Sequence, residues 1–218
     1  MTKAEIMKRV LATGIVPVVR APSAEVALQV VDAIRAGGVD IIELTMTVPG
    51  APKVIEQLVR RYGSDVVVGA GTVLDADTAR TCISAGAQFI VSPALDEGTI
   101  QLCRAEGIAV MPGALTPTEV VRAWKAGADV VKVFPCGAVG GASYIRALKA
   151  PLPQIELMPT GGVSLKTAAE FIQAGACALG AGADLVDLVA IKEGKAELVT
   201  DKARKYVEAI KLARSGQA

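Results

Sequence analysis

The stretch GIVPVVRAPSAEVALQVVDAIRAGGVDIIELTM, residues 14–46, predicts a strand, a helix and a second strand. Its two ends are short runs rich in Val and Ile, which are typical of strands buried on both faces. Between them, residues 23–38 place apolar side chains at helical spacing, start with Ser23 as an N-cap and end in two glycines. The stretch therefore predicts one βαβ unit with two parallel strands.

The same pattern recurs along the whole chain, at a spacing of roughly 20–27 residues, which is the size of one strand and one helix. The apolar runs cover residues 14–20, 40–46, 66–73, 87–94, 108–115, 128–136, 154–163 and 176–183. The helical stretches between them open with Asp, Ser or Thr and close on Gly.

Eight such units predict an α/β fold, a single (β/α)8 TIM barrel that occupies residues 1–218 as one domain. An extra N-terminal helix over about residues 2–12 and a helix over 197–214 complete the chain. The alternative is an open doubly wound sheet, which usually has fewer strands and a G-x-G-x-x-G loop after the first one. The first loop, in GIVPVVRAPS, lacks that motif, which favours the barrel.

Composition excludes several classes of protein. Hydrophobic residues make up 52% of the chain and charged residues 21%, which excludes disorder. The formal charge of +1 gives no field that would attract nucleic acid or an anionic membrane. The sequence contains no His, which excludes His-based triads and His-ligated metals. The four Cys form no C-x-x-C pair and no secretory or membrane-spanning segment is evident, so we expect a soluble cytoplasmic protein.

The sixth apolar run, DVVKVFPC, contains the most informative residue. Lys132 lies between Val130, Val131, Val133 and Phe134, although Lys is rarely buried alone. If it faces the barrel interior, desolvation disfavours its charged form and makes it a nucleophile able to form a Schiff base with a ketone. The alternative is a buried Lys that serves only in a salt bridge.

The second run, DIIELTM, supplies a possible partner for this lysine. Ile41, Glu43 and Thr45 share one face of the strand, and Glu43 is the acid within it. With no His available, a carboxylate is the natural group to shuttle protons. Glu43 could alternatively do no more than neutralise Lys132.

Three further side chains fall at strand ends, where barrel enzymes bind their substrates. Thr72 and Thr160 could bind a carboxylate or hydroxyl, although Thr is also an ordinary strand residue. Arg20 is an anion candidate because its guanidinium suits carboxylate or phosphate, although Arg is often simply exposed.

The last two strand ends are rich in glycine, at Gly161–Gly162 and Gly180–Gly182. Barrels often bind phosphate with the loops after strands seven and eight and a short helix N-terminus. Glycine lets backbone N–H groups approach an anion closely, although ordinary turns also use it. A third glycine-rich stretch, GAVGGAS (137–143), is expected to be a flexible loop.

These segments together resemble one known family, the class I aldolases that cleave 2-keto-3-deoxy-6-phosphogluconate (KDPG) and 4-hydroxy-2-oxoglutarate (KHG) to form pyruvate. The matching segments are GIVPVVR, GGVDIIELTMTVPGA, VVVGAGTVL, AGAQFIVSPALD, MPGALTPTEV, GADVVKVFPC and LMPTGGVS. They span nearly the whole chain, and their combination is highly specific.

The resemblance implies that Lys132 is the Schiff-base lysine and Glu43 the acid/base. It implies that Thr72 and Thr160 contact the keto-acid end of the substrate, with Pro93 as a wall of the pocket. It implies further pocket residues on the phosphate side and in the wall, namely Arg20, Phe134, Gly161, Gly162, Gly180 and Gly182.

The same resemblance implies a homotrimer that acts on a small, phosphorylated 2-keto acid, with no cofactor, no metal and no nucleic-acid or membrane partner. Two positions depart from the family's pattern. Thr47 stands where many members carry an Arg that helps to hold the pyruvate carboxylate, and Ala183 stands where members often have a Ser. Carboxylate binding is then expected to depend more on Thr72 and other donors, and phosphate binding loses one hydroxyl.

Three functions remain open from the sequence. The first is Schiff-base cleavage of KDPG or KHG, or of the C4 epimer 2-keto-3-deoxy-6-phosphogalactonate. The second is a sugar-phosphate isomerase or epimerase, with Glu43 as base and Lys132 as an electrostatic clamp. The third is a non-catalytic binder or scaffold, which an interior lysine disfavours because its burial is costly.

Overall fold

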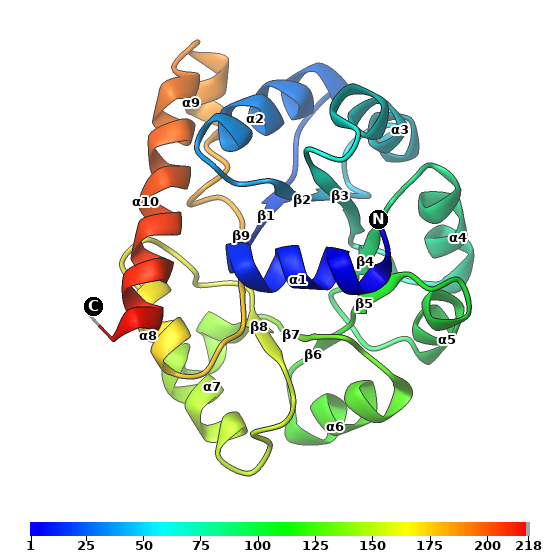
Figure 1. Cartoon of the computed structure of the whole chain (residues 1–218), viewed down its shortest axis with the longest axis vertical. Helices are drawn as coiled ribbons and strands as arrows, with labels where there is room; N and C mark the ends of the chain where they lie inside the picture. The colour runs from blue at the N-terminus through cyan, green and yellow to red at the C-terminus, as the bar shows by residue number, and fades with distance from the viewer. Residues whose placement is uncertain (217–218) are drawn as a thin grey trace.

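The computed structural model describes residues 1–216 and has parallel strands at its centre with helices around them (Figure 1). The strands are β1 (Ile15–Val19), β2 (Ile41–Thr45), β3 (Val67–Gly71), β4 (Phe89–Val91), β5 (Ala109–Met111), β6 (Gly113–Ala114), β7 (Val131–Val133), β8 (Leu157–Pro159) and β9 (Leu179–Ala181). The helices are α1 (Lys3–Thr13), α2 (Ala24–Ala36), α3 (Ala51–Tyr62), α4 (Ala76–Ser84), α5 (Glu97–Ala105), α6 (Pro117–Ala126), the 3-10 turn η1 (Cys136–Val139), α7 (Ala142–Lys149), α8 (Ala168–Gln173), α9 (Leu188–Lys192) and α10 (Ala196–Ser215). Each predicted apolar run contains a strand, and the two terminal helices lie where they were predicted.

The strands form a curled parallel sheet in two hydrogen-bonded parts. One part has six strands in the order β5-β4-β3-β2-β1-β9, and the other has three in the order β6-β7-β8. The fifth predicted run is divided into β5 and β6 by Pro112, which has no N–H to donate to a sheet. Its carbonyl still accepts from the backbone N–H of Lys132 at 2.9 Å. At the other side, an isolated parallel bridge joins Thr160, after β8, to Gly180 of β9.

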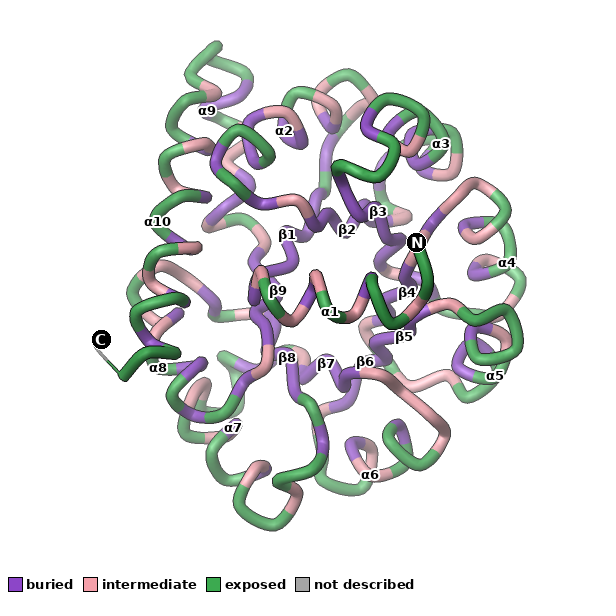
Figure 2. Tube along the Cα trace, viewed as in Figure 1, coloured by how far each residue is buried: buried purple, intermediate pink, exposed green. Residues whose placement is uncertain are grey.

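Two apolar clusters follow from the alternation of side chains along the strands. The larger cluster lies between the strands and the surrounding helices. The smaller cluster lies inside the curl of the sheet and includes Val16, Ile41, Val67, Phe89, Met111, Val130 and Met158. The strands are buried on both faces, whereas the outer faces of the helices are exposed (Figure 2).

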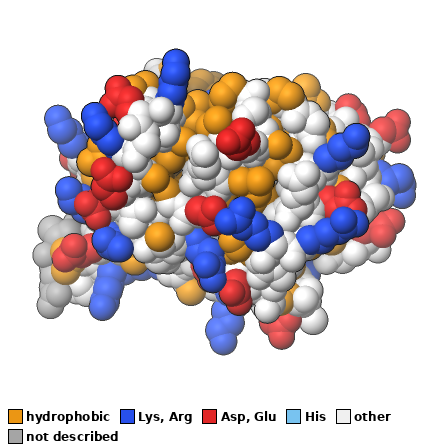
Figure 3. Space-filling model, turned by 90° about the horizontal axis from the view of Figure 1, so that it is seen from above, with side chains coloured by type: hydrophobic (Ala, Val, Ile, Leu, Met, Phe, Trp, Pro, Cys, Tyr) orange, Lys and Arg blue, Asp and Glu red, His pale blue; other side chains and the backbone are white. Residues whose placement is uncertain are grey.

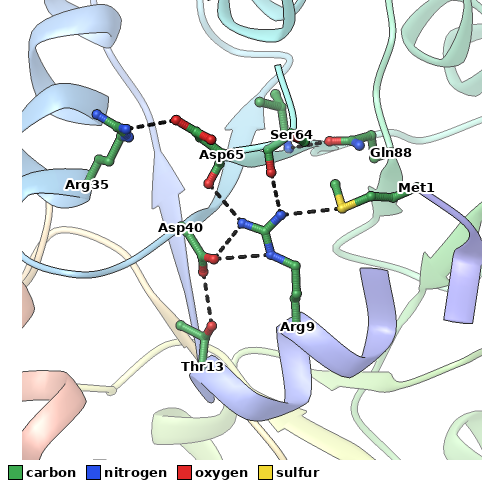
Figure 4. Close-up of polar contacts among 9 residues, drawn as sticks. Met1, Arg9, Thr13, Arg35, Asp40, Ser64, Asp65 and Gln88 are labelled. Carbon is green, nitrogen blue, oxygen red and sulfur yellow. Dashed lines mark hydrogen bonds and ion pairs between the residues drawn. The ribbon is translucent and has the colours of Figure 1, made fainter. Parts of the chain in front are cut away.

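Helix α1 lies across the N-terminal ends of the strands, where Ile6 and Val10 extend the inner apolar cluster. Arg9 fixes this helix to the loops that precede β2 and β3 (Figure 4). Its guanidinium donates to the Asp40 carboxylate and to the backbone carbonyls of Ser64 and Asp65. Because α1 covers this end of the sheet, the C-terminal ends of the strands are left for a ligand.

No helix within residues 1–216 is both long enough and apolar enough to cross a lipid bilayer.

Candidate active site

Lys132 and Glu43 form a buried ion pair inside the curl of the sheet, although they belong to different hydrogen-bonded parts of it. The Lys132 Nζ lies 3.7 Å from Glu43 Oε1, and the two side chains are 4% and 0% exposed. The Lys132 ammonium also lies over the Phe134 ring, 5.6 Å from its centroid. The alternation of β2 and β7 thus points both charged groups inward, as the sequence predicts.

Two of the inward polar side chains have oxygens without a hydrogen-bond partner. Among the described residues, neither Glu43 oxygen nor the Thr160 hydroxyl has one, and all three atoms are buried. Burying a polar group without a partner costs about 1–3 kcal/mol, more for a charge. Such a cost is typical of a site whose polar groups act on a ligand rather than on the protein itself.

Thr72 has an unusual backbone at the end of β3. Its φ is 59°, in the left-handed region that β-branched residues avoid. Hydrogen bonds on both sides hold this conformation, from Met46 N to Gly71 O at 2.8 Å and from Val73 N to Val91 O at 3.2 Å. Strain that the surroundings enforce is a sign of function, and Thr72 is half-buried at the C-terminal end of the strand, where barrel enzymes have their sites.

A pocket of about 280 Å³ lies at the C-terminal ends of β1, β8 and β9. It brings together seven residues that the sequence singles out, namely Arg20, Phe134, Thr160, Gly161, Gly162, Gly180 and Gly182. Glu43, Lys132, Thr72 and Pro93 are not in its wall. Phe134, which contacts the Lys132 ammonium, connects the pocket to the ion pair. Pro93 follows β4 and is half-buried.

Backbone N–H groups are the pocket's main hydrogen-bond donors besides Arg20. Gly161 and Gly162 adopt φ values of 83° and 79°, which favour glycine. Within residues 1–216, the N–H groups of Gly162, Val163 and Ala183 donate to no acceptor of the chain. They are therefore available to an anion.

The short helix that follows β9 has two of its N-terminal donors already engaged. Asp187 caps α9, and its carboxylate accepts from the N–H groups of Val189 at 3.1 Å and Ala190 at 3.0 Å. Of the features expected at a barrel phosphate site, the two glycine loops are therefore present, but the helix N-terminus is occupied by the chain's own carboxylate.

Asp184 and Tyr206 were missed by the sequence reasoning. Asp184 lines the pocket, and its Oδ2 accepts from the Tyr206 hydroxyl at 2.7 Å. Burial, together with the nearby carboxylate, raises the pKa of Tyr206 above its usual value, so the phenol keeps the proton it donates. No signal in the sequence pairs these residues, because Tyr206 lies on α10 and reads as an ordinary apolar helix position.

Thr47, which follows β2, has its hydroxyl engaged within the chain. The buried Thr45 hydroxyl donates to the Val19 carbonyl at 3.2 Å, and it lies 2.6 Å from the Thr47 hydroxyl. The Thr47 hydroxyl is thus hydrogen-bonded to Thr45 within the chain.

Two further observations concern the Cys136 thiol, which follows β7, and groups of metal-ligating residues. Burial raises the pKa of the Cys136 thiol to about 11, so it is un-ionised at neutral pH. Among the described residues, no three His, Cys, Asp or Glu side chains form a group that could hold a metal ion.

The chain is similar to known proteins in sequence and in overall structure. The family model described as KDPG and KHG aldolase matches residues 6–202. The 2-dehydro-3-deoxy-phosphogluconate aldolase of Treponema pallidum is 35% identical over 72% of this chain and 75% of its own length. The 2-dehydro-3-deoxy-6-phosphogalactonate aldolase of Escherichia coli K12 is 34% identical over 90% of this chain and 96% of its own.

A solved structure agrees with these relatives. The KDPG aldolase of Legionella pneumophila, with pyruvate captured at low pH as a covalent carbinolamine intermediate, superposes with a TM-score of 0.84. It is 28% identical, and the match covers 91% of this chain and 96% of that one.

Proposed function

Because the chain belongs to the KDPG and KHG aldolase family, and is therefore a carbon–carbon lyase, we propose that it cleaves 2-keto-4-hydroxy acids through a Schiff base on Lys132. KDPG would give pyruvate and glyceraldehyde 3-phosphate, and KHG would give pyruvate and glyoxylate. The galactonate epimer of KDPG is the alternative substrate, which the Escherichia coli relative supports. The observation that carries the proposal is the buried Lys132–Glu43 pair.

The proposed reaction starts at the Lys132 ammonium, which gives one proton to Glu43. The free Nζ attacks the C2 carbonyl carbon, and Glu43 returns the proton to the hydroxyl that forms there, which leaves as water and gives a protonated imine. Glu43 then takes the proton of the C4 hydroxyl, and the C3–C4 bond breaks as its electrons enter the imine. This step leaves an enamine on Lys132 and a free aldehyde. The protonated Glu43 gives its proton to C3, and water hydrolyses the protonated imine to release pyruvate and restore the Lys132 ammonium.

Both charged groups suit these roles. Glu43 has no hydrogen bond from residues 1–216, so its oxygens can exchange protons with the substrate without breaking one. The iminium accepts the electrons of the breaking bond, which is the task that a Lewis acid would otherwise perform.

The ends of the substrate are assigned by their surroundings. We propose that Thr72 and Thr160 bind the keto-acid end, with Pro93 and Phe134 as walls. Arg20 and the loops at Gly161–Gly162 and Gly180–Gly182 take the phosphate, since they share one pocket. Because the Thr47 hydroxyl is hydrogen-bonded to Thr45, carboxylate binding depends more on Thr72.

Trapping with pyruvate and borohydride tests the mechanism. We expect one added mass, on Lys132, and neither trapping nor cleavage in Lys132→Ala. Lys125→Ala, which removes an exposed lysine of α6, is the matched control and should behave as the wild type. Undiminished cleavage by Lys132→Ala would overturn the Schiff-base mechanism and favour an electrostatic role for the lysine.

The substrate is tested by comparing rates of pyruvate release from KDPG, its galactonate epimer and KHG. We expect the phosphorylated acids to be cleaved faster than KHG, because KHG is shorter and has no phosphate to place among the donors around Arg20 and Gly162. Faster cleavage of KHG would show that this pocket does not bind phosphate during turnover.

We also propose that the sheet closes into a single-domain (β/α)8 barrel over residues 1–218, of which 217–218 lie outside the described part. Counting β5 and β6 as one strand interrupted at Pro112 gives eight strands. The bridge between Thr160 and Gly180 supports closure between β8 and β9. Slow hydrogen exchange of amides in all eight strands would agree with closure, whereas rapid exchange along β8 would argue for an open edge.

A homotrimer in the cytoplasm completes the proposal. Apolar side chains lie exposed among charged ones on the side seen in Figure 3. Leu74 and Trp124 are among the large apolar residues that are exposed. Subunit contacts would bury such surface. Light scattering should give three times the 22.3 kDa chain mass.

The four cysteines are free thiols, which suits a reducing compartment such as the cytoplasm.

A further inference from the structure

Gly71, the last residue of β3, lies beside the carboxylate of Glu43. In the parallel ladder, Gly71 pairs with Thr45 of β2, and Glu43 pairs with Gly69. Gly71 therefore lies on the same inner face as Glu43, on the neighbouring strand and one inward-facing position further along. Its φ is not in the left-handed region, so no backbone conformation requires glycine here. What glycine provides at this position is space.

The Glu43 side chain fills that space. A Cβ built on Gly71 would lie 1.9 Å from Glu43 Oε1 and 2.5 Å from both Cδ and Cγ. Rotating the carboxylate would move its oxygens but would leave Cγ and Cδ overlapping the added methyl group. The whole side chain would therefore have to move by an ångström or more, within a site where Glu43 is completely buried.

We propose that Gly71 is a positioning residue for the reaction. Because Gly71 has no side chain, the Glu43 carboxylate can occupy the place that sets its distance from Lys132 and from the reacting atoms. This inference rests on the proposed role of Glu43 as the acid/base. A displacement of about 1 Å in such a group commonly lowers a rate by up to a hundredfold.

Gly69 offers a matched control on the same strand and the same face. A Cβ there would lie 2.3 Å from the Phe89 ring, so Gly69→Ala disturbs apolar packing and not the carboxylate. Both substitutions overcrowd the interior, but only the Gly71 clash involves Glu43.

The experiment places Gly71→Ala and Gly69→Ala in the wild type and in Glu43→Ala. Two rates are measured, namely kcat for cleavage and exchange of the C3 protons of pyruvate in heavy water. In the wild type, Gly71→Ala should lower both rates by about tenfold or more, with a much smaller change in KM. In Glu43→Ala, which removes the overlapping atoms, Gly71→Ala should change the exchange rate by less than about twofold. Gly69→Ala should have the same effect in both backgrounds.

Thermal midpoints supply a second measurement if exchange in Glu43→Ala is too slow to follow. Gly71→Ala should lower the midpoint of the wild type and lower that of Glu43→Ala less, whereas the Gly69→Ala shift should be equal in both. Equal effects of Gly71→Ala in both backgrounds would refute the positioning role. If Glu43→Ala alone leaves proton exchange unchanged, the acid/base role of Glu43 fails instead, which separates the two hypotheses.

Discussion

At the scale of single residues, the site is built from groups that the fold would be more stable without. Lys132 and Glu43 are buried together, and the carboxylate has no hydrogen bond from the described chain. A buried pair of this kind often stabilises a protein less than apolar residues of the same size would. The sequence predicts both residues, because a charged side chain inside an apolar strand is conspicuous.

The ion pair predicts non-additive stability. Lys132→Met and Glu43→Gln should each lower the free energy of unfolding by about 3 kcal/mol, because each leaves the other group as an uncompensated buried charge. The double variant should lie within about 1 kcal/mol of the wild type, while remaining inactive. Urea unfolding at neutral pH measures this, and additive losses in the double variant would contradict it.

Thr72 predicts a trade between stability and binding. Thr72→Gly relieves the left-handed backbone at φ 59°, so we expect no loss of stability and a gain of up to about 1 kcal/mol. Without the hydroxyl, KM should rise severalfold. Thr72→Val is the control, because it lacks the hydroxyl but keeps the strain, and it should raise KM with no gain in stability. Urea unfolding and initial rates provide both quantities, and a marked destabilisation by Thr72→Gly would contradict the idea of strain.

Some site residues could not be predicted because their roles depend on contacts distant in sequence. Gly71 reads as part of a strand end, and only the position of Glu43 shows what it leaves room for. Asp184 lies in the turn after β9 and accepts a hydrogen bond from the Tyr206 hydroxyl of α10. Spacing along a chain carries no information about such pairs.

At the scale of elements, local rules located most boundaries correctly. Ser23, Asp75, Asp96 and Thr116 each cap the helix that follows, as predicted from residue type. The differences come from hydrogen bonding that a local pattern does not reveal. Pro112 divides the fifth strand, and residues 137–143, expected to be a flexible loop, contain most of the 3-10 turn η1 and the start of α7.

The capping box of α6 predicts a pH-dependent contribution to stability. The backbone N–H groups of Thr116 and Leu115 donate to Glu119 and hold the pKa of its carboxyl below 4.5. A lowered pKa in the folded state stabilises the fold above the unfolded pKa, and this is lost as pH falls through the folded value. Glu119→Ala should therefore cost about 1 kcal/mol near pH 7, with the difference narrowing below about pH 4. Urea unfolding at both pH values measures it, with the exposed Glu208→Ala as control.

At the scale of the whole molecule, the two ends of the sheet have separate tasks. The N-terminal end is covered by α1 and fixed by Arg9, while the C-terminal end carries the pocket and strained Thr72. The eight-fold repeat predicts this division, because barrel enzymes bind substrates at the C-terminal ends. The packing of α1 across the N-terminal ends of the strands could not be predicted, because its capping residues indicate a helix but not the surface that the helix covers.

This separation predicts a variant that is unstable but active. Arg9→Met keeps the aliphatic stem but removes donors to Asp40, Ser64 and Asp65, so we expect a loss of about 2 kcal/mol in unfolding free energy. Below the unfolding temperature, kcat/KM should stay within about twofold of the wild type. Arg60→Met, at an exposed ion pair, should cost less than about 0.5 kcal/mol. A large fall in kcat/KM for Arg9→Met would show that the two ends are coupled.

The position of α1 has a practical consequence for handling the enzyme. Met1 is 49% exposed and lies beside Arg9, on the side of the molecule turned away from the pocket. Attachment to a resin or an electrode through an N-terminal tag would leave the entrance of the pocket accessible to solvent and to substrate. The same attachment would transmit any pulling force to α1, which covers the opposite end of the sheet. The hydrogen bonds of Arg9 would then be the first contacts to bear that force.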